Sequence, residues 1–144
     1  MTLATADRNG RPWVSPVWFA SVDYCEFFWV SSPNARHSRN IAARPDIAIV
    51  VFDSNQEPGA GQAVYLSAIA ERVPETDLDR AIAIYSDLSE RQGLPAWIRD
   101  DVVPTARHGL YRAAATEHFV LTDTDERFLI DLYPTREGCA ACTR

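Results

Sequence analysis

FFWVSSPNARHSRNIAARPDIAIVVFD, residues 27–53, contains two apolar segments separated by a polar one. The first, residues 26–32, has the length and composition of a β-strand that is apolar on both faces. The second, Asp46 to Asp53, is a continuous apolar run of strand length, which predicts a central strand buried on both sides. The stretch as a whole therefore predicts a strand, a short helix and a second strand.

The short helix has a start and a stop signal. Ser32-Pro33 predicts the start, because serine can cap free N–H groups and proline suits the first helical position. Arg44 precedes Pro45 and is thereby pushed out of the helical region, so we expect the helix to end near Ala43.

The charges at the helix start are unusual. A helix N-terminus favours acidic residues, but this one carries Arg36, His37 and Arg39 and no acid. Each cation costs roughly 0.3–1 kcal/mol against the dipole at a surface, and a bound phosphate would reverse the sign of these terms. The pattern indicates a phosphate site; the alternative is a solvated face paired with acids elsewhere. Hydroxyl donors are added by Ser31, Ser32 and Ser38.

The segment before residue 27 predicts a hairpin. Leu3 to Ala6 begins as a strand, and Asn9-Gly10 is typical of a tight turn. Residues 11–22 form the next predicted strand, in which Pro16 should mark a bulge or an unpaired edge.

Aromatic residues crowd these strands, directly before the predicted anion site. A phosphate pocket beside an apolar cleft is what a phosphorylated aromatic cofactor requires, and flavin mononucleotide (FMN) is the candidate. The aromatic residues are Trp13, Trp18, Phe19, Phe27, Phe28 and Trp29.

The second half predicts three strands and one amphipathic helix. The strands are residues 63–73, 109–123 and 127–133. The helix has Thr76 and Asp79 as a capping box and Gly93 as its stop. Its apolar residues recur at helical spacing, and they are Leu78, Ile82, Tyr85 and Leu88. About seven strands joined mostly by hairpins favour an antiparallel barrel with helices packed on it, the alternative being an open α+β sheet.

Composition sets further limits. The 144 residues predict a single domain over 1–144, and the net charge of −6 argues against general binding to nucleic acid or an anionic membrane. No apolar stretch is long enough to span a membrane and no signal peptide precedes the first strand, so we expect a cytoplasmic protein.

The three cysteines, an odd number, argue against a disulfide framework. Cys139 and Cys142 form a C-x-x-C that is either a redox or metal motif or two free thiols in a frayed tail. Cys25 is expected to be a small core residue.

Three stretches occur in the order found in a known family: LATADRNGRPWVSPVWF (3–19), the stretch 27–53, and GQAVYLSAIAERV (61–73). Together they resemble the pyridoxamine 5'-phosphate oxidase-like family of FMN-binding split-barrel proteins. The resemblance implies a mainly β fold, an antiparallel six- to seven-stranded split barrel with one short and one amphipathic α-helix. It also implies a homodimer with flavin at the subunit interface, and an FMN-dependent oxidoreductase that transfers hydride to or from a small organic substrate.

The same resemblance assigns binding residues. It implies that the flavin ring rests against Pro16, Val17, Trp18 and Phe19, and that Gln62 lies near its pyrimidine edge. It implies that the phosphate is held by Ser31, Ser32, Arg36, His37 and Arg39, with Asn40 in support. It names no catalytic residue in this sequence.

Two positions depart from the family pattern. His37 stands where relatives have a lysine and is only partly charged near neutral pH. Asp131 stands where authentic pyridoxamine phosphate oxidases have an arginine for the vitamin substrate, and a carboxylate would repel its phosphate. We therefore expect a substrate other than vitamin B6.

Two alternatives stay open. The cofactor could be a deazaflavin coenzyme whose acidic tail follows a basic track, or the chain could be a non-catalytic flavin- or heme-binding module. A metal site is not expected, since His37, His108 and His118 are scattered. The basic track would consist of Arg8, Arg11, Arg36, Arg39 and Arg44.

Overall fold

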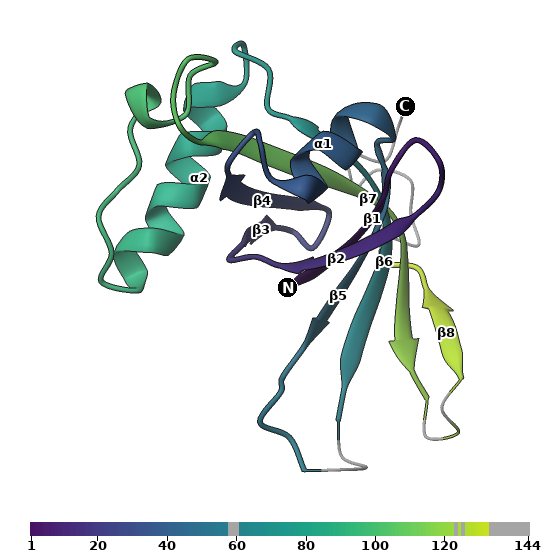
Figure 1. Ribbon diagram of the computed structural model, residues 1–144. Coiled ribbons are helices and arrows are strands. Elements are labelled where there is room, and N and C mark those ends of the chain that lie inside the picture. The colour runs from purple at the N-terminus through teal and green to yellow at the C-terminus, as the bar shows by residue number, and fades with distance from the viewer. Residues whose placement is uncertain (58–60, 123, 125, 133–144) are drawn as a thin grey trace.

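The structure is a computed structural model that describes residues 1–57, 61–122, 124 and 126–132 (Figure 1). In this part of the chain, eight antiparallel strands form one sheet and two α-helices pack on it. The strands are β1 (Thr2–Ala6), β2 (Pro12–Pro16), β3 (Ala20–Val22), β4 (Glu26–Ser31), β5 (Asp46–Phe52), β6 (Ala63–Arg72), β7 (Gly109–Leu121) and β8 (Arg127–Ile130). The helices are α1 (Arg36–Ala43), α2 (Leu78–Arg91) and the short 3-10 helix η1 (Arg99–Asp101).

The mainly β, antiparallel architecture predicted from the sequence is confirmed. The sheet runs in the order β2-β1-β5-β6-β7-β4-β3, and β8 pairs with β7. No pairing joins β2 to β3 among the described residues, so the sheet is split between them, as in a split barrel. There is one strand more than expected because residues 11–22 form two strands. Pro16 ends the first of them, β2, which is an edge strand as predicted.

Strand β7 links the two halves of the sheet. It pairs with β6 along most of its length, with β4 through its first half and with β8 through its last four residues. The register shifts at Ser67/Ala68 on β6, which marks a bulge. Strands β4 and β8 thus pair with the same edge of β7, one with its first half and the other with its last four residues.

Two groups of buried side chains form the core. The first lies between α1 and β1, β4, β5, β6 and β7, and the second lies under α2. Strand β4 serves both, since Phe27 and Trp29 enter the first and Phe28 the second. The prediction that this strand is apolar on both faces is confirmed. Cys25 is buried, as expected for a small core residue.

The prediction that β5 is buried on both sides is wrong. Ile47 and Ile49 are buried, whereas Asp46, Ala48 and Phe52 are exposed. The first core group covers one face only. The opposite face of β5 is open in the single chain.

Helix α1 ends at Ala43 as predicted, but it begins at Arg36, three residues after Pro33, the predicted first helical residue. The Ala35 N–H donates to the Ser32 carbonyl (3.0 Å), and the Ser32 hydroxyl accepts from the Asn34 N–H (3.2 Å). Residues 32–35 therefore form a turn with Pro33 at its second position, which the fixed φ of proline suits as well as it suits a helix start.

Helix α2 shows the predicted inner face but not the predicted cap. Leu78 and Tyr85 are buried, and Gly93 follows the helix with φ +73°. Its N-cap is Asp77, without a side-chain cap, because Thr76 donates to the Asp77 carboxylate instead (3.1 Å).

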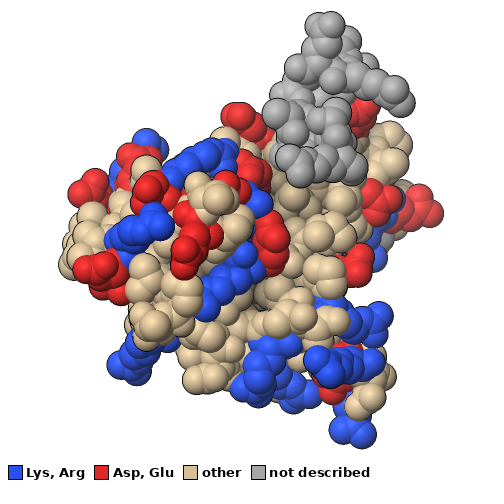
Figure 2. Space-filling model, turned by 90° about the horizontal axis from the view of Figure 1, so that it is seen from above, with Lys and Arg blue, Asp and Glu red and all other residues tan. Residues whose placement is uncertain are grey.

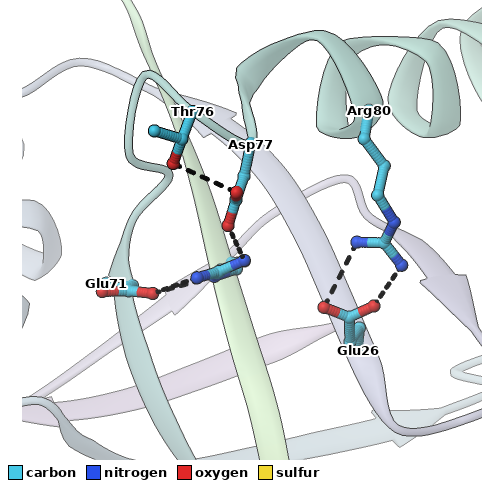
Figure 3. A network of polar contacts seen from close by, with 6 residues as sticks. Glu26, Glu71, Thr76, Asp77 and Arg80 are labelled. Atoms are coloured by element: carbon cyan, nitrogen blue, oxygen red, sulfur yellow. Dashed lines mark hydrogen bonds and ion pairs between the residues drawn. The ribbon is translucent and has the colours of Figure 1, made fainter. Parts of the chain in front are cut away.

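Ion pairs attach α2 to the sheet (Figure 3). Arg112 on β7 contacts Glu71 on β6 (2.6 Å) and Asp77 (2.7 Å), and Arg80 on α2 contacts Glu26 on β4 (2.5 Å). The hydrogen bond from Arg112 is the main reason that the pKa of Asp77 is lowered. The N-terminal end of α2 is thus fixed to β4, β6 and β7.

The described helices include none that is long and apolar enough to cross a membrane. The C-x-x-C at Cys139 and Cys142 lies outside the described residues.

Candidate anion and cofactor site

The start of α1 has the properties of an anion site. Its N-cap is Ala35, no side chain caps the first N–H groups, and its first turn has no acid. The hydroxyl oxygen of Ser38, in that turn, is buried and has no hydrogen-bond partner among the described residues. Uncapped N–H groups and an unpartnered buried hydroxyl both fit a bound phosphate.

Arg36 is exposed and stands over an aromatic ring. Its guanidinium carbon lies 4.5 Å from the centroid of the Trp13 ring on β2. It also acts on the β1–β2 turn: the pKa of Asp7 is lowered mainly by the Arg11 N–H, and the charges of Arg11 and Arg36 add to this. The Arg36 guanidinium has no ion pair with any described residue.

Arg39 and Asn40 connect the start of α1 to the preceding turn and to β1. The guanidinium of Arg39 donates to the Asn34 carbonyl in the preceding turn. The Asn40 side-chain N–H donates to the Thr5 hydroxyl (3.0 Å), which in turn donates to the Trp13 carbonyl (3.3 Å). Asn40 is buried, so it fixes α1 against β1 and β2.

His37 lies between two serines from different strands. Its Nε2 is 2.8 Å from the Ser31 hydroxyl oxygen on β4, and its Nδ1 is 3.1 Å from the Ser15 hydroxyl oxygen on β2. The residue is 8% exposed, whereas both serines keep part of their surface exposed. Burial lowers the pKa of His37, so the ring is neutral near pH 7.

Basic side chains are concentrated around this site. The chain contains no lysine, and several arginines pair with acids around α2. Gly10, in the β1–β2 turn, lies so close to Arg44 that a side chain there would reach its guanidinium at 3.6 Å. Figure 2 shows basic side chains gathered in one corner of the face, apart from the mixed charges on the side of α2. The arginines that form no ion pair with any described residue include Arg8, Arg11, Arg36, Arg39 and Arg44.

Pro16, Val17 and Trp18, three of the residues expected to contact the flavin ring, border a separate cleft. A hollow of about 400 Å³ is lined by Met1, Thr2, Pro16, Val17, Trp18 and Phe52. Trp18 is 76% exposed there. Phe19 instead packs against Phe27, with ring centroids 6.0 Å apart, and Gln62 is an exposed residue before β6. Neither lines the hollow.

A second hollow, about 420 Å³, opens on the outer face of the sheet. Strands β1, β2, β5, β6, β7 and β8 contribute to it, and its lining includes Val14, Ala48, Val50 and Phe119. Val14 is 58% exposed. This face is the uncovered side of β5.

The structure thus brings Ser31, Arg36 and His37 together with β2. Ser32 is engaged in its own turn, and no residue of the predicted phosphate segment lines the ring cleft. Ser15 was missed by sequence reasoning, and strand alternation could have found it: Trp13 and Ser15 are two residues apart on β2, and both face α1.

Comparison with known proteins identifies the family of the chain. Residues 1–119 match the pyridoxamine 5'-phosphate oxidase family. The pyridoxine/pyridoxamine 5'-phosphate oxidase of Ectopseudomonas mendocina (strain ymp) is 30% identical over 129 residues, which is 90% of this chain and 54% of that protein. The chain therefore spans about half the length of this curated relative.

Solved structures share the fold. A heme-binding protein from Mycobacterium smegmatis matches with a TM-score of 0.71 and 21% identity, over 91% of this chain and 52% of that one. HutZ, a heme storage protein from Vibrio cholerae, matches with a TM-score of 0.63 and 25% identity, over 83% of each chain. An F420 reductase matches with a TM-score of 0.57 and 24% identity, over 81% of this chain and 86% of that one.

The family match covers more than half of the chain and includes every strand from β1 to β6, both α-helices and most of β7. The chain belongs to the pyridoxamine 5'-phosphate oxidase family.

Proposed function

We propose that this chain binds FMN and acts as a flavin-dependent oxidoreductase on a small organic substrate. The observation that carries the proposal is the start of α1. There, the first turn of α1 has uncapped N–H groups and the buried, unpartnered Ser38 hydroxyl, and Arg36, over Trp13 of β2, has no ion pair with a described carboxylate. An anion satisfies all of these groups at once. Family membership makes a flavin phosphate the first candidate.

In this proposal each residue has a defined part. Arg36 and Arg39 offer planar donors to phosphate oxygens, with further donors from the hydroxyls of Ser31 and Ser32. The flavin, when bound, supplies the redox chemistry, and the protein supplies binding, orientation and electrostatics. The apolar residues Pro16, Val17 and Trp18 form the wall for the ring. Phe19 backs this wall through its contact with Phe27, and Gln62 is proposed for the pyrimidine edge.

We propose a homodimer in which a second copy covers the outer face of the sheet. Strand β5 has a composition suited to burial on both sides, yet its outer face is open in the single chain. The hollow at Val14 and the cleft at Trp18 leave large apolar surfaces in water. A self-complementary partner would cover both and complete the ring site.

Asp131 is the basis for proposing a substrate other than vitamin B6. By the sequence resemblance, Asp131 falls where authentic oxidases carry the arginine that contacts the vitamin. A negative charge there disfavours a phosphorylated substrate. The relative from Ectopseudomonas mendocina is named for that substrate but is about twice as long as this chain.

A deazaflavin and heme are the two alternatives to FMN as the cofactor. The basic residues Arg8, Arg11 and Arg44 extend the site and suit the acidic tail of a deazaflavin, and the F420 reductase shares the fold. Heme is less favoured, because His37 has both ring nitrogens hydrogen-bonded and the Nε2–H of His118 donates to the Tyr24 carbonyl oxygen (2.8 Å).

The decisive experiment is the absorbance and mass spectrum of the purified protein, followed by titration with FMN, riboflavin, F420 and hemin. We expect a flavin spectrum, FMN released on denaturation, and tighter binding of FMN than of riboflavin. Bleaching by a reductant and reoxidation by a small acceptor would support the activity. Binding of F420 or hemin with no affinity for FMN would refute the proposal.

A further inference from the structure

The hydrogen bonds of His37 constrain the two serines that hold it. A neutral imidazole has one donor and one acceptor nitrogen. Because both nitrogens contact serine hydroxyls, one serine accepts from the ring and the other must donate its own proton to the ring. The donating serine then has no O–H left for a ligand. Only one of Ser15 and Ser31 can donate to an anion while His37 is neutral.

Protonation of His37 changes the number of serine hydroxyls that can donate to an anion. An imidazolium donates from both nitrogens, so both hydroxyl oxygens accept and both O–H groups are free to donate outward. The ring also gains a positive charge beside the start of α1. We propose that His37 is a positioning residue that couples the binding of the FMN phosphate to the uptake of one proton. This inference rests on the proposed function, because it needs FMN at this site.

The surroundings set the direction of the coupling. In the free protein the ring is buried, which lowers the pKa of His37. A phosphate dianion at the helix start would attract the protonated ring and raise the pKa of His37 again. Two groups of charged residues lie on the elements around the ring. Those near the start of α1 are Arg36, Arg39, Arg44 and, in the β1–β2 turn, Asp7, Arg8 and Arg11. On the strands, Glu26 of β4 pairs with Arg80, Glu71 of β6 pairs with Arg112, and Arg72 of β6 donates to the Val102 and Val103 carbonyls.

The sign of the pH effect follows. If bound FMN raises the pKa of His37, protons are taken up on binding between the free and the bound value. FMN affinity then increases as the pH falls through this window. The phosphate group works in the opposite direction, since it becomes a monoanion near its second pKa of about 6. A test must separate the two titrations.

The matched variant is His37→Gln. Glutamine keeps one donor and one acceptor but takes up no proton, and the titration of the phosphate is unchanged. Calorimetric titration with FMN in buffers of different ionisation enthalpy, from pH 6 to pH 8, counts the protons taken up. We expect the wild type to take up more protons than H37Q, and riboflavin to cause no uptake. The ratio of wild-type to H37Q affinity for FMN should rise as the pH falls, by at most about tenfold per pH unit for one proton.

A second measurement uses the wild-type protein alone, so its result does not depend on whether a variant folds. Two-bond ¹H–¹⁵N spectra distinguish neutral from protonated histidine rings, and His108 and His118 serve as internal references. We expect the His37 ring to change from a neutral to a protonated pattern when FMN binds at pH 7. FMN binding with a ring that stays neutral and no excess proton uptake would overturn the coupling and leave the proposed function intact. Failure of the folded protein to bind FMN would overturn both.

Discussion

The guanidinium carbon of Arg36 lies 4.5 Å from the centroid of the Trp13 ring, so a cation at the start of α1 is held by an aromatic side chain of β2. Arg36 is exposed and would otherwise sample many rotamers. A cation–π contact at an exposed site contributes about 0.5–1 kcal/mol. The contact therefore orders the proposed phosphate donor before any ligand arrives, which would lower the entropy cost of binding.

Trp13→Leu should weaken FMN binding about two- to fivefold, which corresponds to loss of that contact. Riboflavin, which lacks the phosphate, should bind as before. Flavin fluorescence quenching measures both affinities. Trp18→Leu is the control, because Trp18 lines the ring cleft and its loss should weaken both ligands alike. An equal loss for both ligands in Trp13→Leu would contradict the arrangement.

Arg36→Ala combined with Arg39→Ala should lower FMN affinity by several kcal/mol, since each charge-assisted contact contributes about 1.5–3 kcal/mol. Riboflavin affinity should hardly change. Arg91→Ala with Arg99→Ala removes the same charge from the side of α2, where both arginines pair with acids. This control should retain FMN affinity; if it loses as much, the effect is one of net charge.

Val14→Glu tests the proposed dimer. Val14 is 58% exposed in the single chain, so the change should alter the stability of an isolated protomer by no more than about 0.5 kcal/mol. If a second copy covers this face, the buried carboxylate should dissociate the dimer and release flavin. Light scattering coupled to size-exclusion chromatography gives the mass. Leu94→Glu, at a residue of similar exposure after α2, should remain dimeric.

Asp77→Asn tests the ion-pair network at α2. The pKa of Asp77 is lowered from its ordinary value of 3.8, first by its hydrogen bond to Arg112. Between the lowered folded pKa and the ordinary value of 3.8 the unfolded chain therefore binds more protons than the folded one, so the stability from this pair is present above the ordinary value and is lost as the pH falls through the folded pKa. Thermal unfolding between pH 3 and pH 7 should show a smaller acid loss in the variant. An unchanged acid profile would show that Asp77 does not contribute to it.

Short sequence motifs correctly predicted the turns and helix ends that depend only on residues adjacent in the chain. Gly10 has φ +80° in the turn predicted from Asn9-Gly10, and α1 ends at Ala43, before the Arg44-Pro45 pair. The helix start was misplaced because Ser32-Pro33 serves a β-turn and a helix cap equally well. The exposed face of β5 could not be foreseen, since an apolar run does not tell which of its faces a single chain covers.

The candidate site was predicted in part. The unusual charge at Arg36 and Arg39 is a local property, and their lack of ion pairs to described carboxylates agrees with the sequence interpretation. The burial of His37 is not a local property. Its partner Ser15 lies 22 residues away and meets it only because β2 crosses the start of α1. No spacing rule connects these two residues.

Edge strand β2 begins with Pro12 and ends with Pro16. Proline has no amide proton, so at both ends this strand has nothing to donate to a further strand. Polymerisation by strand addition along this edge is thereby discouraged, a safeguard that natural sheets use against runaway aggregation. The homodimer proposed above would instead form through side chains on the broad surface of the sheet, where closed symmetry limits an assembly to a finite number of copies.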